Sequence, residues 1–256
     1  MPKATLKQPK IVYPSGVKEI NNDLSTDDLV RRLKECAQSF QNMSQEDDNS
    51  AYIPLAMHLA SENFLEHPSK DVRLLIACCI ADVFRVFAPD APYKDPEQLK
   101  AIFYFFIEQL QGLEDPKDTI FKRYFYLLEN LAWVKTFNIC IELEENQQIF
   151  TKLFHLIFSI VNDNHSTKVK NFMLDMMCPL ILEADTISQP MLDIILDQIV
   201  EPKKIKVELV EETGAIKEDV DMAEVASEKS KDKEMKEVAG EVSEKDQEMR
   251  NEISRD

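Results

Sequence analysis

The sequence is poor in glycine and in long hydrophobic runs, and each shortage excludes a class of protein. Only 4 of the 256 residues are glycine, so few positions suit the left-handed turns of nucleotide-binding loops and tight β-hairpins. The longest apolar run, residues 74–81, is far too short to span a bilayer, and no apolar signal segment follows the N-terminus. The prevalence of Leu, Ile, Phe, Glu, Lys and Met instead favours an all-α protein.

Basic residues are outnumbered as well. The chain has 30 Lys and Arg against 47 Asp and Glu, a formal net charge of −17. Binding to nucleic acid phosphates depends on clustered basic side chains, so we expect no direct nucleic acid contact. The 5 cysteines are an odd number and Cys78 adjoins Cys79, which argues against a disulfide framework and favours the nucleus or cytosol.

No pattern of catalytic or metal-ligating residues stands out. The four histidines form neither an HExxH motif nor a zinc spacing with cysteine. His58 and Glu62 share a predicted helix face, where a polar pair is a commoner explanation than a ligand pair. All five cysteines fall in apolar helical patterns and are expected in the core: Cys36, Cys78, Cys79, Cys140 and Cys178. We therefore expect no enzyme activity, metal or cofactor; a buried, metal-loaded histidine pair would revive an enzymatic interpretation.

Apolar residues recur at helical spacing over most of the chain. Ser25 or Thr26 caps the first expected helix, Ser69 caps a later one, and Asp95 followed by proline opens another that Gly112 closes. Pro179 should kink the helix that contains it. The helices expected after the first are 52–66, 70–87, 95–112, 118–137, 146–161, 166–183 and 191–200.

The helices come in pairs, and the second helix of each pair begins with basic residues. These starts centre on residues 72, 123 and 169, at spacings of 51 and 46 residues. The spacing is close to the roughly 40–47-residue period of HEAT and armadillo arrays, so the pattern predicts an α-solenoid of paired antiparallel helices.

Composition divides the chain into three parts. Residues 1–22 are polar, with uncompensated lysines, and predict an extended basic arm; we expect folding to begin near Ser25. Residues 23–202 form the solenoid. Residues 203–256 are acidic and lack Phe, Trp and Tyr, so they predict a disordered tail.

One loop interrupts the helical array with two prolines, a carboxylate and a phenol. It consists of Ala88, Pro89, Asp90, Ala91, Pro92 and Tyr93. The prolines pre-shape the backbone, Asp90 has no basic neighbour within the loop, and Tyr93 offers a ring with a hydroxyl, so the loop could grip a peptide that carries an arginine and an aromatic residue. The alternative is that the segment only ends one helix and starts the next.

Two further features have two interpretations each. Trp133 could anchor a partner peptide, but core packing is the commoner role of an aromatic residue at helical spacing. Lys122, Arg123 and Lys135 could bind an acidic partner, whereas a solvated face is the usual explanation for such a group.

Four blocks carry a more specific signal: residues 55–68, 70–85, the loop 88–93 and 121–135. With them the chain resembles the N-terminal region of the precocious-dissociation-of-sisters (Pds) family of sister chromatid cohesion proteins. The resemblance implies a long HEAT-repeat protein without enzymatic activity. It also implies a protein that binds the cohesin ring through its kleisin subunit and regulates the release of cohesin from chromatin and its retention there.

In this family the loop is the docking site for short Tyr-Ser-Arg-type motifs of Wapl, of sororin and of the cohesin acetyltransferase. All six loop residues stand intact here, so the resemblance implies the same site at residues 88–93. Our hypothesis assigns Asp90 to the arginine of the motif, and Tyr93 with the proline faces to its aromatic ring.

The chain departs from the family in its length. The repeats that carry the kleisin-binding and inositol-phosphate-binding surfaces are not in this sequence, so we expect a truncated form with weakened cohesin binding. An uncovered end of the solenoid predicts marginal stability or self-association. The resulting expectation is a non-catalytic, nuclear, chromatin-associated cohesion regulator; the alternative is a structural scaffold fragment whose acidic tail binds basic chromatin proteins.

Overall fold

A computed structural model describes residues 10–184 and 186–200, and within these ranges all regular structure is helical. The expectation of an all-α fold is confirmed. The tail at 203–256 and residues 1–9 of the arm lie outside the described residues. The α-helices are α1 (Thr26–Gln41), α2 (Ile53–Leu59), α3 (Glu62–Leu65), α4 (Lys70–Val86), α5 (Pro96–Leu110), α6 (Phe121–Trp133), α7 (Asn146–Ile160), α8 (Thr167–Leu182) and α9 (Gln189–Val200). Three 3₁₀ helices accompany them: η1 (Ser50–Tyr52), η2 (Gln111–Leu113) and η3 (Thr136–Glu142).

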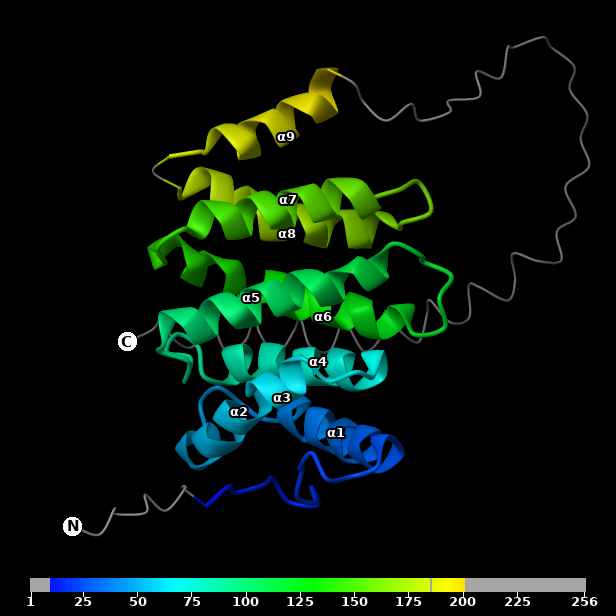
Figure 1. Cartoon of the computed structure of the whole chain (residues 1–256), viewed down its shortest axis with the longest axis vertical. Helices are drawn as coiled ribbons and strands as arrows, with labels where there is room; N and C mark the ends of the chain where they lie inside the picture. The colour runs from blue at the N-terminus through cyan, green and yellow to red at the C-terminus, as the bar shows by residue number, and fades with distance from the viewer. Residues whose placement is uncertain (1–9, 185, 201–256) are drawn as a thin grey trace, which may run out of the picture. The chain divides into compact units, whose positions relative to one another are not determined.

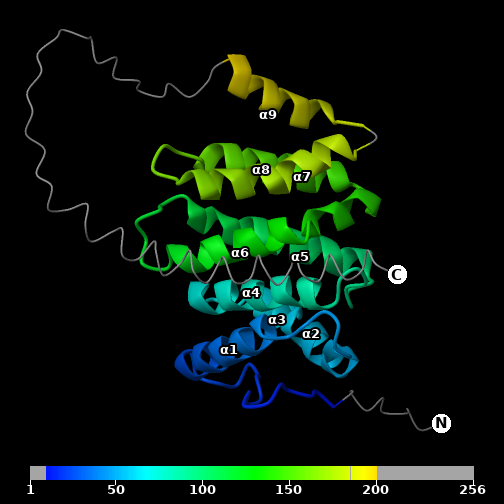
Figure 2. The same ribbon diagram turned by 180° about the vertical axis from the view of Figure 1, so that it is seen from behind.

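The described helices pack as two layers. Helices α1, α4, α6 and α8 follow one another in the layer that Figure 2 brings forward, and α5, α7 and α9 follow one another in the layer facing the viewer in Figure 1. The short α2 and α3 pack against α4. The helices with basic starts, α4, α6 and α8, all belong to the same layer, which confirms the repeat read from their spacing.

Several helix starts follow the predicted capping. The hydroxyl of Ser25 accepts a hydrogen bond from a backbone N–H of the first turn of α1 at 3.2 Å, and Asp95 and Ser166 do the same for α5 and α8 at 3.4 Å each. Ser69 takes the N-cap position of α4, but its side chain makes no capping hydrogen bond. Pro179 lies inside α8, as expected.

Three of the expected helices differ from the prediction. The helix expected at 118–137 ends at Trp133, and Lys135 adopts a left-handed backbone (φ 49°) before η3 begins. The expected helix at 52–66 is broken, because Ser61 adopts an extended backbone (φ −74°, ψ 150°) and a new turn, α3, begins after it. Gly112 does not close α5 with a left-handed residue; it lies in η2, where a side chain would overlap the ring of Tyr124. The glycine is therefore needed for close packing rather than for backbone freedom.

The described part of the N-terminal arm belongs to the fold, so the expectation that folding begins near Ser25 is wrong. Ile20 is only 1% exposed. Its carbonyl accepts a hydrogen bond from the hydroxyl of Tyr13 at 3.2 Å and lies 2.8 Å from Nε2 of His58. The contact with His58 attaches the segment to α2. Burial of the apolar Ile20 side chain stabilises this attachment, although most residues of the segment are polar.

One carboxylate, Asp82 of α4, is completely buried in the core. Its Oδ1 accepts hydrogen bonds from the Tyr126 hydroxyl at 2.7 Å and from the Asn130 amide at 2.9 Å. Arg85 pairs with it at 3.3 Å and also donates to the Phe40 carbonyl at the end of α1. Burial raises the pKa of Asp82, and its hydrogen bonds and Arg85 oppose that rise. The network ties α1, α4 and α6 together.

Within residues 10–184 and 186–200, no helix combines the length and hydrophobicity needed to cross a bilayer.

Candidate peptide-docking site

The loop of residues 88–93 joins α4 to α5 and is held at its first residue. The Ala88 carbonyl accepts a hydrogen bond from Nε2 of Gln45 at 2.6 Å, and the peptide bond between Ala88 and Pro89 is cis. Gln45 belongs to the connection between α1 and η1, so the loop is attached to a segment distant in sequence.

Tyr93 is the second anchor of the loop. Its side chain is 2% exposed, its ring centroid lies 5.3 Å from that of Phe84, and its hydroxyl donates to the Ala56 carbonyl at 3.3 Å. Burial raises the pKa of this phenol far above its usual range. The direct role expected of Tyr93 is therefore corrected: a buried ring offers no face to a peptide, and the residue fixes the loop to α2 and α4 instead.

Asp90 is the most accessible group of the loop, with its side chain 90% exposed. The loop itself has no basic residue, but Lys94, just beyond it, lies 3.5 Å from Asp90 Oδ1 and is itself 70% exposed. Such a solvated pair contributes little free energy, so a cation of a partner can replace Lys94 at small cost.

The remaining four residues of the loop differ in how far they are buried. Ala91 is buried, and Ala88 and Pro92 are half-buried. Pro89 is exposed beside Asp90. The structure thus offers a carboxylate and an apolar proline face on a backbone held at both ends, which suits a short peptide with one cation and one apolar ring.

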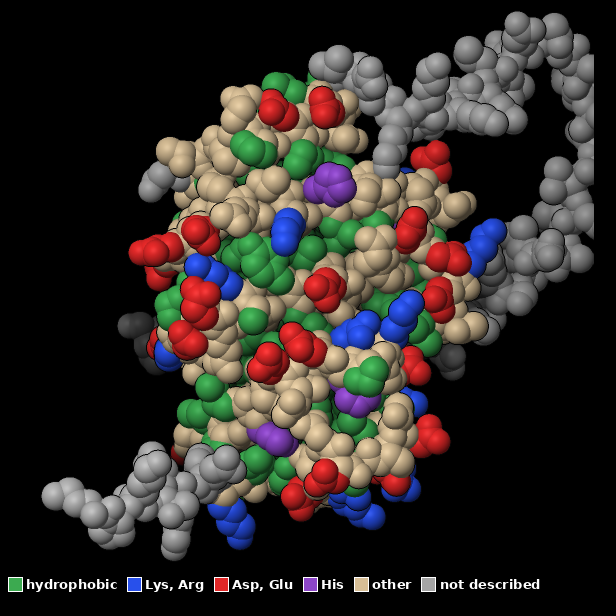
Figure 3. All heavy atoms as spheres, viewed as in Figure 1, with side chains coloured by type: hydrophobic (Ala, Val, Ile, Leu, Met, Phe, Trp, Pro, Cys, Tyr) green, Lys and Arg blue, Asp and Glu red, His purple; other side chains and the backbone are tan. Residues whose placement is uncertain are grey.

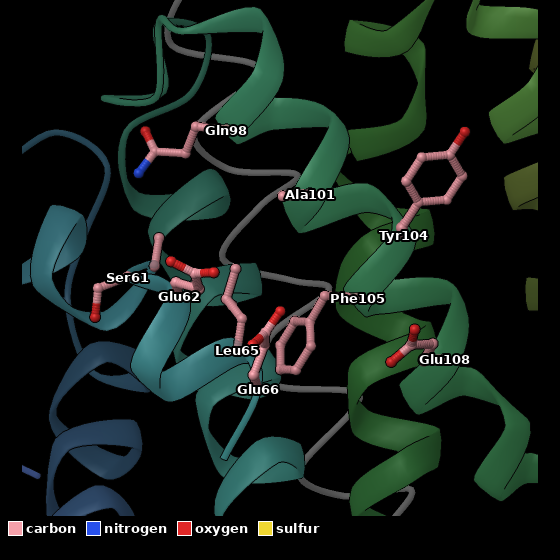
Figure 4. A pocket seen from close by; sticks show the side chains of 10 residues that line it. Ser61, Glu62, Leu65, Glu66, Gln98, Ala101, Tyr104, Phe105 and Glu108 are labelled. Carbon is pink, nitrogen blue, oxygen red and sulfur yellow. The ribbon is translucent and has the colours of Figure 1, made fainter.

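A cavity of about 520 Å³ lies close to this loop, between α3 and α5 (Figure 4). Leu65 and Phe105 give it an apolar floor, and Glu62, Glu66 and Glu108 stand around them. In the space-filling view, acidic side chains gather over α3 and α5 with apolar atoms between them (Figure 3). The cavity could not be predicted from the sequence, because it adjoins the helix break at Ser61, which local patterns do not indicate.

Trp133 is 76% exposed, so the expectation of core packing is wrong. It lines a groove of about 410 Å³ with Phe172, Pro179 and Leu182 of α8. Cys178 lies in the same groove and is exposed, in contrast to the expectation that all five cysteines are core residues. The other four cysteines are buried, and burial raises the pKa of the Cys78 thiol to about 12.

The remaining candidate residues are not brought together. Lys122 and Arg123 lie in the first turn of α6, and Lys135 lies two residues after its end, so the predicted basic group is spread along a whole helix. His58 and Glu62 lie on different helices, α2 and α3, and the contact of His58 with the Ile20 carbonyl is structural. Among the residues that the structure describes, no cluster of three His, Cys, Asp or Glu side chains could hold a metal ion.

Comparisons with known proteins agree with this architecture. The family model for the sister chromatid cohesion protein PDS5 matches residues 27–247. PDS5 homolog A of Mus musculus is 53% identical over 197 residues, which cover 76% of this chain and 15% of that protein. PDS5 homolog B-A of Xenopus laevis is 52% identical over the same length, 14% of its chain. This chain thus spans about one seventh of the relatives that it matches.

A solved structure of a Pds5–Scc1 complex has a similar fold. Its TM-score is 0.66 at 25% sequence identity, and the match covers 78% of this chain and 30% of that chain. The similarity supports the HEAT-repeat solenoid read from the helix spacing.

Proposed function

Because the chain belongs to the sister chromatid cohesion protein PDS5 family, we propose that it is a non-catalytic regulator of cohesion that docks short peptide motifs on the loop of residues 88–93. The observation that carries the proposal is the difference in burial between two residues of the loop. Tyr93 is buried and hydrogen-bonded, whereas Asp90 is almost fully exposed. A loop fixed in this way loses little conformational entropy on binding, so a few contacts suffice for useful affinity.

The proposed ligands are Tyr-Ser-Arg-type motifs of Wapl, sororin and the cohesin acetyltransferase. Asp90 would receive the arginine by displacing Lys94, and the exposed face of Pro89 would receive the aromatic ring. This assignment replaces Tyr93 by Pro89 as the apolar contact. The proposed place of action is chromatin in the nucleus.

Cohesin itself is a second proposed partner. The relative of known structure is described as a complex with Scc1, and this chain matches 30% of that relative. We propose that cohesin binding is weaker for this chain than motif docking, since the family places its kleisin-binding surface in later repeats.

The experiment that tests the docking proposal is calorimetric titration of the whole chain with a short peptide that contains Tyr-Ser-Arg. We expect Asp90→Lys to weaken binding by about tenfold or more, because the variant places a cation where the arginine must sit. Asp163→Lys is the matched control, since it makes the same charge change at an exposed residue outside the loop. Equal affinity of the two variants would refute the proposed site.

A scaffold role for the acidic segment at 203–256 is the alternative, favoured by its composition alone. Removal of these residues separates the two proposals. Retention of basic chromatin proteins would be lost if the scaffold role holds, whereas motif binding to the loop would persist.

A further inference from the structure

We propose that the cavity between α3 and α5 is a second binding site, which takes an arginine side chain of a partner peptide. The proposal concerns residues outside the loop 88–93 and does not depend on motif docking there. It rests on the volume of the cavity, on the character of its floor and on three carboxylates that lack basic partners.

The cavity has the size and lining of a binding site. Its volume of about 520 Å³ lies within the roughly 300–1,000 Å³ typical of ligand sites. Phe105, which is 4% exposed, and the half-buried Leu65 form an apolar floor in Figure 4. The extended backbone of Ser61 separates α2 from α3 at its edge. Such a floor accepts the methylene groups or the flat face of a long side chain.

The carboxylates set the charge of the ligand. Glu62 begins α3, Glu66 follows its last residue, and Glu108 comes from α5. All three are exposed at the cavity. None of them forms an ion pair with a residue in the described part of the chain, which spans 10–184 and 186–200. Glu66 is the C-cap residue of the helix that Glu62 begins, so two like charges flank one short turn. A bound cation would reduce the repulsion between them.

Two lysines of the same layer are engaged with other groups. Lys100 of α5 pairs with Glu97 at 3.0 Å and with Glu145 at 3.7 Å. Lys152 of α7 lies over the ring of Tyr104, 4.3 Å from its centroid. Neither lysine forms an ion pair with Glu62, Glu66 or Glu108.

The cavity favours an organic cation over a metal ion. Its carboxylates are not among any described group of three or more acidic, histidine or cysteine side chains that could hold a metal. They stand apart around an apolar floor, and this arrangement fits a guanidinium group, which is planar, weakly hydrated and able to form two parallel hydrogen bonds with a carboxylate. The strongly hydrated ammonium group of lysine suits such a floor less well.

The cavity and the loop are neighbours but separate. Gln98, at the edge of the cavity, follows Tyr93 by five residues, and Ala60 at the opposite edge lies one turn after Ala56, to which Tyr93 is bonded. Neither Asp90 nor Pro89 lines the cavity. Substitutions in one site therefore leave the other intact, and the two proposals can fail independently.

The test is titration of the isotope-labelled whole chain with the peptide acetyl-Gly-Leu-Arg-Leu-Gly-amide, followed by NMR. We expect saturable shifts of the Leu65 and Ala101 methyl resonances, both of which line the cavity. The peptide with citrulline in place of arginine, which is neutral and nearly isosteric, should bind about fivefold more weakly or worse, and the lysine peptide should fall between them.

Paired variants complete the test. Glu62→Gln/Glu66→Gln should weaken arginine-peptide binding about fivefold or more, as should Glu108→Gln. Asp163→Asn/Asp197→Asn removes two exposed carboxylates elsewhere and should leave it unchanged, as should Asp90→Lys in the loop. Circular dichroism establishes that each variant is folded. Equal binding of the citrulline peptide, unchanged affinity of the glutamine variants, or shifts confined to residues 88–93 would each overturn the proposal.

Discussion

The first and last helices of the described solenoid differ in how far their apolar side chains are covered. Around α1 the apolar side chains are covered: Phe40 is fully buried, and Ile20 of the preceding segment is 1% exposed. Around α8 and α9 several are not: Leu182 is 83% exposed, Ile199 70% and Leu196 44%. Each repeat of a solenoid buries its core against a neighbour, so the exposure of these side chains depends on what packs beside their helix.

Both candidate sites lie in the part of the solenoid whose apolar side chains are covered. The loop 88–93 and the cavity at α3 lie in the well-packed N-terminal half, where Tyr93, Gln45 and the Asp82 network fix the backbone. Recognition of a small motif needs such fixed geometry. The exposed leucines and isoleucines of α8 and α9 offer a broad apolar surface, which is suited to association.

The largest expected effect comes from removing a core aromatic at the first helix. Phe40→Ala should lower the free energy of unfolding by about 3–5 kcal/mol, because Phe40 is fully buried and its loss leaves a cavity. Leu182→Ala, the matched change on the exposed face of α8, should stay within about 0.5 kcal/mol. Urea denaturation measures both, and a similar cost for the two variants would remove the contrast between the ends.

The next effect concerns the segment before α1. Ile20→Ala should cost about 2 kcal/mol, since the side chain is buried but lies at the edge of the fold. Ile199→Ala is the control on α9 and should change the free energy of unfolding only slightly. If Ile20→Ala were also neutral, the segment would contribute no stability and the first helix would be uncovered like the last ones.

A smaller effect should appear as pH dependence. The pKa of Asp82 is raised above its ordinary value of 3.8, so as pH rises past about 4 the unfolded chain loses this proton before the native state does. Deprotonation then favours unfolding, and wild type should lose stability relative to Asp82→Asn until the native carboxyl titrates. Urea denaturation of both proteins from pH 4 to pH 8 measures this loss of stability.

Asp163→Asn, at an exposed carboxylate, is the control for this pH series. Wild type that gained stability relative to Asp82→Asn over the same range would show that the hydrogen bonds and Arg85 outweigh burial.

The smallest expected change in stability accompanies a change in association. Leu196→Lys/Ile199→Lys places two charges on the exposed face of α9 and should alter the free energy of unfolding by less than about 0.5 kcal/mol per site. Because that face is apolar, we expect wild type to self-associate and the double variant to remain monomeric in sedimentation experiments. A monomeric wild type at high concentration would contradict the predicted self-association.

Most helices could be predicted from the sequence because their signals are local. The caps at Ser25 and Asp95 and the spacing of basic helix starts needed no tertiary knowledge, and the intact loop residues marked the candidate site. The family match and the similar solved fold confirm the predicted family and solenoid, whereas the docking site at the loop stays a prediction.

Tertiary context decided what the sequence could not. Tyr93 and Trp133 are both aromatic residues near helix ends, yet the first is 2% and the second 76% exposed, because Ala56 and Phe84 enclose one and no described helix covers the other. The cavity at the Ser61 break likewise depends on how separate segments meet. Such features follow from packing and not from periodicity.

Because Tyr93 anchors the loop, the melting temperature of the protein reports whether a ligand occupies the loop. The Tyr93 hydroxyl is hydrogen-bonded to α2 and its ring packs against α4, so the loop loses its structure when these helices unfold. A peptide that binds only the intact loop raises the free energy of unfolding by mass action, by about 2.7 kcal/mol at one hundred times its dissociation constant. Occupancy of the loop can therefore be followed in a thermal scan, without a label on either partner.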